Sequence, residues 1–230
     1  MSPSSPTDRF ERLARGAGLI SVVLLFAGVV VQGGESTPLL TDSVSKTTDY
    51  FSSGPGTADW AGQAIEVLSF LVLIPFVAAV TSAIRTRGGQ TLGLTAFGAG
   101  LLYTGMSLTP GMAALGAAWY RAGHGFGGDT AIALNDLRDV TFYLSLSVLA
   151  VFVGAVAVAV LQLGIAPRAY GWIAAVVAVL LLVPPVAPPA MLLGLVWMAA
   201  FSVALVRRPG SEAEPGTRVA TGSPAAALTD

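Results

Sequence analysis

The feature that most constrains the fold is an uncharged run near the end of the chain. Residues 169–206 contain 38 positions without a formally charged side chain, whereas about 20 apolar residues suffice for a helix to cross a bilayer. The motif "PPVAPP" (184–189) lies at the centre of this run, and four prolines in six residues cannot continue a helix. Proline can end one helix and occupy the first turn of the next. The run therefore predicts two membrane spans, 169–184 and 188–206, joined by a tight hairpin.

Four more apolar runs of span length precede this hairpin. In the whole chain, 54% of residues are hydrophobic and 11% are charged, against about 25% charged residues in an ordinary soluble domain. The sequence therefore predicts an all-α, polytopic bundle of six transmembrane helices that fills residues 16–208. The first four predicted spans cover residues 16–33, 61–84, 90–108 and 139–163.

The distribution of basic residues predicts how these spans are threaded. The first run follows a basic segment, 1–15, and is longer than the apolar core of a signal peptide, so we expect an uncleaved span. With six spans, three basic residues fall on one side of the membrane, Lys46, Arg121 and Arg138, and nine fall on the other. The nine are Arg9, Arg12, Arg15, Arg85, Arg87, Arg168, Arg207, Arg208 and Arg218. The positive-inside rule then places both termini in the cytoplasm. The tail, 209–230, is rich in small and polar residues, which predicts disorder.

Two connecting segments have features of their own. Residues 34–60 form a polar loop in which Leu40, Val44, Thr47 and Phe51 fall at helical spacing. A short surface helix and a disordered loop are both compatible with that pattern. In the third span, Pro110 should end or kink the helix, because proline lacks an N–H and clashes with the preceding turn.

One carboxylate interrupts the second span. Gln63, Glu66 and Ser69 share one helical face at i, i+3 spacing. In the structural interpretation, Glu66 is paired with Arg138, or failing that with Tyr103 or Tyr143. In the functional interpretation, Glu66 binds a proton, a cation or a cationic substrate, because acids within membrane spans commonly mark functional sites. The candidate polar cluster thus comprises Glu66, Gln63, Ser69, Arg138, Tyr103 and Tyr143.

Composition excludes several classes of function. The chain has no cysteine and one histidine, so neither thiol chemistry nor a histidine-based metal site is expected. Its net charge of −1 offers no basic surface for nucleic acid. Signature motifs of metalloproteases, serine hydrolases and nucleotide-binding proteins are missing from the sequence. We therefore predict no catalytic residue, cofactor or metal.

The leading prediction is a non-enzymatic membrane protein, either a small transporter or a membrane-embedded accessory subunit. Its expected surroundings are the lipid bilayer and either a membrane-protein partner or a small ligand. The alternative is a membrane enzyme that acts at the outer surface. Its candidate residues form an acidic and basic cluster, Asp129, Asp136, Arg138 and Asp139.

The chain resembles six-span integral membrane proteins of high-GC, actinobacterial-type bacteria. The resemblance covers residues 10–208 and rests on the basic N-terminus, the acidic first outer loop and two short motifs. These motifs are "ALNDLRD", which leads into the fourth predicted span, and "LGIAPRAYGW", which leads into the fifth. The resemblance implies a single domain of six spans in a bacterial plasma membrane, and no particular activity.

Overall fold

The computed structural model describes residues 6–33, 37–52, 54–125 and 128–207, and the chain within these ranges is helical with no strand. The expected all-α fold is therefore confirmed, while the predicted disordered tail, 209–230, lies outside the described residues. The helices are α1 (Pro6–Val31), α2 (Val44–Ser52), α3 (Thr57–Arg85), α4 (Gln90–Met106), the π-helical segment η1 (Ser107–Ala113), α5 (Ala114–Gly123), α6 (Gly128–Leu163), α7 (Arg168–Leu181) and α8 (Ala187–Arg207).

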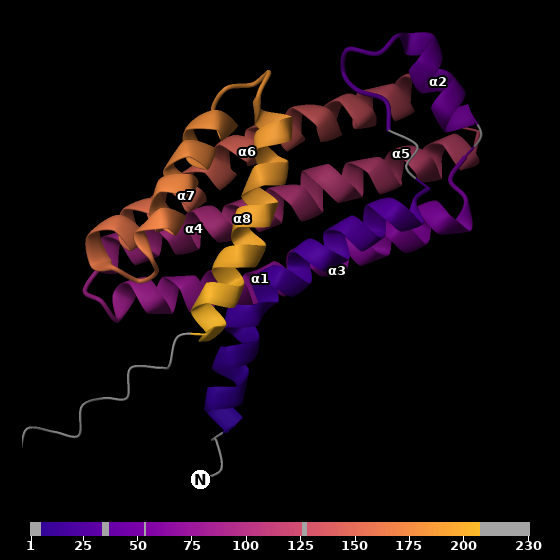
Figure 1. Cartoon of the computed structure of the whole chain (residues 1–230). Coiled ribbons are helices and arrows are strands. Elements are labelled where there is room, and N and C mark those ends of the chain that lie inside the picture. The colour runs from indigo at the N-terminus through magenta and orange to yellow at the C-terminus, as the bar shows by residue number, and fades with distance from the viewer. Residues whose placement is uncertain (1–5, 34–36, 53, 126–127, 208–230) are drawn as a thin grey trace, which may run out of the picture.

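The long helices form one bundle with a small helical cap at one end. α1 packs along α3, α4 packs between α3 and α6, and α7 packs on α6. α8 crosses the front of the bundle at a steep angle and reaches α1 (Figure 1). α2 lies at the end of the bundle where α5 ends and α6 begins (Figure 1). We call this region the α2 end.

Within the described ranges, four helices are long and apolar enough to cross a membrane, namely α1, α3, α6 and α8, and α7 is a shorter apolar helix. Large apolar side chains are exposed on these helices, such as Val30 on α1, Leu68 on α3 and Val196 on α8. Large contiguous exposed apolar patches are rare on soluble monomers, and exposed apolar side chains recur along each of these helices. Helix lengths and surface together are those of a membrane protein.

The third predicted span does not break at Pro110. Instead α4 continues through the π-helical turn η1 directly into α5, so a single helical path runs from Gln90 to Gly123. A π-helix bonds i to i+5 and has a wider turn than an α-helix, which accommodates a proline ring that would clash in α-helical geometry. The expected interruption is thus a change of helical pitch.

Apolar side chains fill the centre of the bundle. Phe76, Leu146, Val156 and Phe201 are each 0% exposed. Phe201 contacts the Phe76 ring at 6.5 Å between centroids and stacks on Trp197 at 5.1 Å. The indole N–H of Trp197 donates to the Tyr170 carbonyl at 3.0 Å, which joins α8 to α7. The steeply crossing α8 is therefore anchored in the core.

A second, smaller apolar cluster lies at the α2 end. It consists of Phe51 from α2, Leu115, Ala118 and Trp119 from α5, and Ala131 from α6. Of the two interpretations of residues 34–60, the short helix is correct, because α2 forms and buries Thr47 and Phe51. Leu40 and Val44 are exposed, at 49% and 66%. Only the second half of the predicted apolar face therefore packs inward.

Candidate functional site

The candidate polar cluster centres on a very close crossing of α1 and α3. A Cβ atom added to Gly28 would lie 2.8 Å from the Gly62 carbonyl oxygen, and one added to Gly62 would lie 2.6 Å from the Gly28 carbonyl oxygen. Real Cβ atoms essentially never approach another atom this closely. Small residues let helix backbones approach in this way in membrane proteins. Only glycine therefore fits at both positions.

The carboxyl group of Glu66 is part of this crossing. Gln32 lies four residues after Gly28, and Glu66 lies four residues after Gly62, so each side chain lies against the glycine of the opposite helix. The two meet head to head, and Gln32 Nε2 donates to Glu66 Oε1 at 2.9 Å. The antiparallel helices thus contribute one glycine and one polar side chain each. Two close backbone contacts and one hydrogen bond hold α1 against α3.

Glu66 is 8% exposed and faces α1, as the energetic penalty of a lipid-facing carboxyl predicts. The hydrogen-bond partner of Glu66 is Gln32, where Arg138 was expected, although the Arg138 charge still acts on the Glu66 carboxyl through space. The Arg138 guanidinium forms an ion pair with Asp139, the next residue along α6. Gln32 was missed because it follows the last residue of α1 and reads as part of the polar loop. The equal four-residue spacing of Gly28–Gln32 and Gly62–Glu66 is the signal that could have found it.

Gln63 points to a different neighbour, the π-helical turn. Its Nε2 donates to the Met112 carbonyl at 2.6 Å. Gly116 leaves room for the amide, since a Cβ there would lie 3.3 Å from Nε2. Beside this contact Trp60 and Trp119 meet edge to face, with centroids 5.4 Å apart. Gln63 Oε1 is buried and has no hydrogen-bond partner among the described residues. Gln63 therefore fastens α3 to η1 and α5.

The remaining candidates, Ser69, Tyr103 and Tyr143, do not converge on one site. The Ser69 hydroxyl donates to the carbonyl of Glu66 in its own helix at 2.6 Å. Tyr103 is buried on α4, where its ring meets Phe70 edge to face at 6.0 Å. Tyr143 is 40% exposed on α6 and lines a groove beside the α7–α8 turn. Ser69 and Tyr103 thus have local structural contacts, and Tyr143 faces outward.

The second polar cluster holds an extended segment against α6 at the α2 end. Asn135 Nδ2 donates to the Pro38 carbonyl at 3.1 Å, and Arg138 Nη2 donates to the same oxygen at 3.3 Å. The Leu40 N–H donates to Asp139 Oδ2 at 2.6 Å. Because Asn135 and Asp139 are 0% and 4% exposed, these bonds form in a dry environment, where a lost partner is expensive. We call the segment from Pro38 to Leu40 the strap, and we call its bonds to Asn135, Arg138 and Asp139 the strap clamp.

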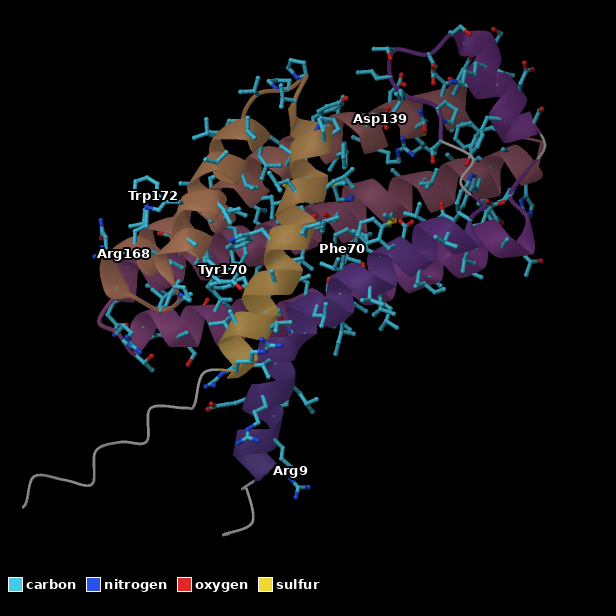
Figure 2. All side chains as sticks on the ribbon, in the orientation of Figure 1. Arg9, Phe70, Asp139, Arg168, Tyr170 and Trp172 are labelled. Atoms are coloured by element: carbon cyan, nitrogen blue, oxygen red, sulfur yellow. The ribbon has the colours of Figure 1, made fainter. Side chains whose placement is uncertain are left out.

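Two residues of the predicted outer-surface cluster, Arg138 and Asp139, belong to the strap clamp. Asp139 lies at the end of the molecule near α2, opposite Arg168 and Trp172 (Figure 2). Its two oxygens accept from Leu40 and from Arg138. Asp136 is half-buried, and Asp129 is exposed at the start of α6. The geometry of Asp139 and Arg138 is that of a structural clamp, with both groups engaged in holding the backbone.

A third set of polar contacts lies around Asp42, just before helix α2 begins at Val44. Asp42 Oδ2 accepts from the Lys46 ammonium and from the Leu39 N–H, each at 2.8 Å. The Lys46 ammonium first, and then the Leu39 N–H, hold the pKa of the Asp42 carboxyl below its ordinary value. The pair is exposed, so its effect is local to the segment before α2.

Among the described residues, no group of three or more His, Cys, Asp or Glu side chains converges as metal ligands would. Comparisons with protein-family models, curated proteins and solved structures found no match. The resemblance to six-span bacterial membrane proteins therefore stays a prediction from sequence. Function has to be argued from the geometry of this chain.

Proposed function

We propose that the protein is a non-enzymatic, membrane-embedded accessory subunit with six spans, in a bacterial plasma membrane. One observation carries the proposal: the centre of the bundle is occupied by apolar side chains that are fully buried, including Phe76, Leu146, Val156 and Phe201. A solute or ion path needs polar groups or a water-filled cavity at membrane depth. A bundle whose centre is filled by apolar side chains instead suits a subunit with a structural role.

The polar side chains support the same interpretation. Glu66 and Gln63 join helices to one another, and Asn135, Arg138 and Asp139 join α6 to the strap. A carboxylate that couples transport has to exchange protons or ions with water during the cycle. Glu66 instead bonds the neighbouring helix at a crossing where the backbones leave no room for a side chain.

Helix lengths support six spans. α4 has 17 residues and η1 adds 7, so α4 with η1 is long enough to cross about 30 Å of hydrocarbon at 1.5 Å per residue. α7 has 14 residues, or about 21 Å of helix, and can be accommodated by local thinning of the bilayer. With α1, α3, α6 and α8, these make the proposed six.

The same arithmetic places the α2 end outside the membrane. α6 has 36 residues, about 54 Å, which exceeds the hydrocarbon core by roughly 24 Å. The excess falls at its N-terminal end if Leu163 lies near the opposite surface. α2, α5 and the first turns of α6 then form a rigid cap in the aqueous phase, held by the strap clamp. With both termini in the cytoplasm, this cap faces outward and is accessible to an extracytoplasmic partner.

Native purification tests the proposal. A C-terminally tagged chain is released from its own membranes in a mild detergent, with and without prior crosslinking. We expect a membrane-protein partner to be retained at constant stoichiometry, and to be lost on Asp139→Ala, which loosens the cap. Asp129→Ala is the matched control, because Asp129 is exposed outside the clamp. A chain that purifies alone, and in proteoliposomes moves an ion in a way that Glu66→Gln abolishes, would disprove the accessory role.

Reporter fusions test the threading. Reporters placed after Gly89, Arg168 and Arg208 should report the cytoplasm, and those after Gly34 and Gly125 should report the exterior. An exported reporter after Arg208 would exclude the even number of spans.

A further inference from the structure

The bundle carries an open groove between α3 and α4, next to the turn 86–89 that joins them. The groove has a volume of about 520 Å³, and its lining includes Thr81, Arg85, Thr86, Gln90, Leu94 and Phe97. This size is within the range of small-molecule binding sites, about 300–1,000 Å³. No residue of this groove belongs to the two polar clusters described above.

The lining changes character along the groove. Next to the turn it is polar and positively charged, with Arg85, Thr86 and Gln90, whereas Leu94 and Phe97 make the far half apolar. All five of these side chains are exposed on the surface of the bundle. A groove with one polar, positively charged half and one apolar half matches an amphiphile with a polar head and an apolar chain.

Arg85 is held at the polar end by its neighbours. A Cβ at Gly93 would lie 2.6 Å from Arg85 Cγ, so the aliphatic stem of Arg85 packs directly on the backbone of α4. Arg85 Nε then donates to Gln90 Oε1 at 3.0 Å. The guanidinium is thereby fixed beside the N-terminus of α4, which has no side-chain cap at Gly89. A helix N-terminus and an arginine both favour an anion.

Thr81 adds an independent sign of a ligand. Its side chain lines the groove one helical turn from Arg85, about 5.4 Å deeper. Thr81 is 8% exposed, and its hydroxyl has no hydrogen-bond partner among the described residues. The Thr81 hydroxyl oxygen is buried behind this lining, and a change to the second helical χ1 rotamer would be needed to present it to a ligand. Buried polar groups in proteins are nearly always hydrogen-bonded, so a buried hydroxyl without a partner indicates that a partner is missing.

We propose that this groove binds one anionic phospholipid. The lipid phosphate is paired with Arg85 at the N-terminus of α4. An ester carbonyl, one turn deeper, accepts from the Thr81 hydroxyl, and the acyl chain lies along Leu94 and Phe97. The proposal rests on the membrane embedding proposed above, with the α3–α4 turn at the cytoplasmic surface. It does not depend on the accessory role.

Native mass spectrometry of the full chain tests the site. The protein is released from nanodiscs that contain phosphatidylglycerol and phosphatidylcholine, and the lipids it retains are counted. We expect one phosphatidylglycerol per chain, retained in preference to phosphatidylcholine. Arg85→Gln should weaken retention about tenfold, equivalent to about 1.4 kcal/mol. Arg168→Gln is the matched control, since Arg168 begins α7 outside the groove, and should change nothing.

Two further arms distinguish a bound phospholipid from a free phosphate ester and from a general effect of substitution. Thr81→Val should lower phosphatidylglycerol retention several-fold, whereas Thr95→Val should not, because the Thr95 hydroxyl bonds the Thr91 carbonyl of its own helix. Free glycerol 3-phosphate should not displace the lipid, because it lacks the acyl chain. Displacement by glycerol 3-phosphate, equal loss in Arg168→Gln, or no preference for phosphatidylglycerol would each overturn the proposal. An exported reporter after Gly89 would instead disprove the proposed threading.

Discussion

The crossing of α1 and α3 can be tested by adding a single methyl group. Gly62→Ala places a Cβ 2.6 Å from the Gly28 carbonyl oxygen, where an ordinary contact needs about 3.4 Å or more. The Gln32 side chain also lies in the way, with its Cγ closer still to the added Cβ, but the Gly28 oxygen is backbone, which cannot rotate away as a side chain can. The two helices must therefore separate by roughly 0.8 Å at this level.

The magnitude follows from two costs and one opposing gain. Overpacking costs about 1–3 kcal/mol, and the separation would stretch the 2.9 Å bond between Gln32 and Glu66, whose loss costs about 0.5–1.5 kcal/mol. Alanine is a better helix former than glycine by about 1 kcal/mol. We expect Gly62→Ala to lower the free energy of unfolding by roughly 1–3 kcal/mol.

The assay is reversible unfolding in detergent, followed by tryptophan fluorescence and circular dichroism. Gly98→Ala is the matched control, because a Cβ at Gly98 on α4 would meet nothing within 4 Å. It gains the same helix propensity without a clash, and should leave stability unchanged or raise it. If Gly62→Ala proves as stable as Gly98→Ala, the close crossing is refuted.

Three further predictions concern the polar contacts. In a double-mutant cycle of unfolding free energies, Gln32→Ala and Glu66→Ala should couple by about 0.5–1.5 kcal/mol. Arg138→Gln and Glu66→Ala should be additive within about 0.5 kcal/mol. Coupling of Glu66 to Arg138 instead of Gln32 would restore the partner expected from sequence. Asp139→Ala leaves the Leu40 N–H without its acceptor and removes the ion-pair partner of Arg138, which keeps only its bond to the Pro38 carbonyl. It should therefore destabilise the cap by roughly 1–3 kcal/mol and speed proteolysis between Pro38 and Ser43, and unchanged cleavage would contradict the clamp. The pKa of Asp42 is lowered in the folded state from an ordinary value of 3.8. The contribution of Asp42 to stability is therefore complete above that value and is lost as pH falls through the lower folded pKa. The protection factor of the Leu39 amide against hydrogen exchange should then fall in acid, an effect that Asp42→Asn removes.

The apolar runs predicted that the chain is helical, and the prolines of "PPVAPP" predicted where its last two helices divide. The uncharged run 169–206 does divide at "PPVAPP", where α7 ends at Leu181 and α8 begins at Ala187. The spacing of Leu40, Val44, Thr47 and Phe51 left a surface helix and a disordered loop both open, and the structure has the helix, α2. These predictions succeed because apolar periodicity and proline chemistry act locally along the chain.

The sequence was a poorer guide where the backbone pairs with distant residues. Pro110 was expected to end or kink the third span, whereas the helix continues there through the π-helical turn η1 into α5, a change of pitch that the local sequence does not signal. "NDLRD" was recognised as a charged cluster, but its partner is the backbone of Pro38 and Leu40, which no side-chain pattern records. Glu66 was assigned to Arg138 on depth alone, whereas the glycine crossing decides which helix it faces.

The most direct test of a closed bundle is the accessibility of its centre to water. The chain has no cysteine, so each introduced cysteine is the only thiol to react. Ala150→Cys on α6 and Ala174→Cys on α7 replace alanines that are 4% and 0% exposed. Neither should react with a membrane-impermeant thiol reagent from either side, whereas Asp129→Cys in the exposed cap should react from the outside only. Labelling of Ala150→Cys or Ala174→Cys in the folded protein would reveal a water-filled path and contradict the accessory role.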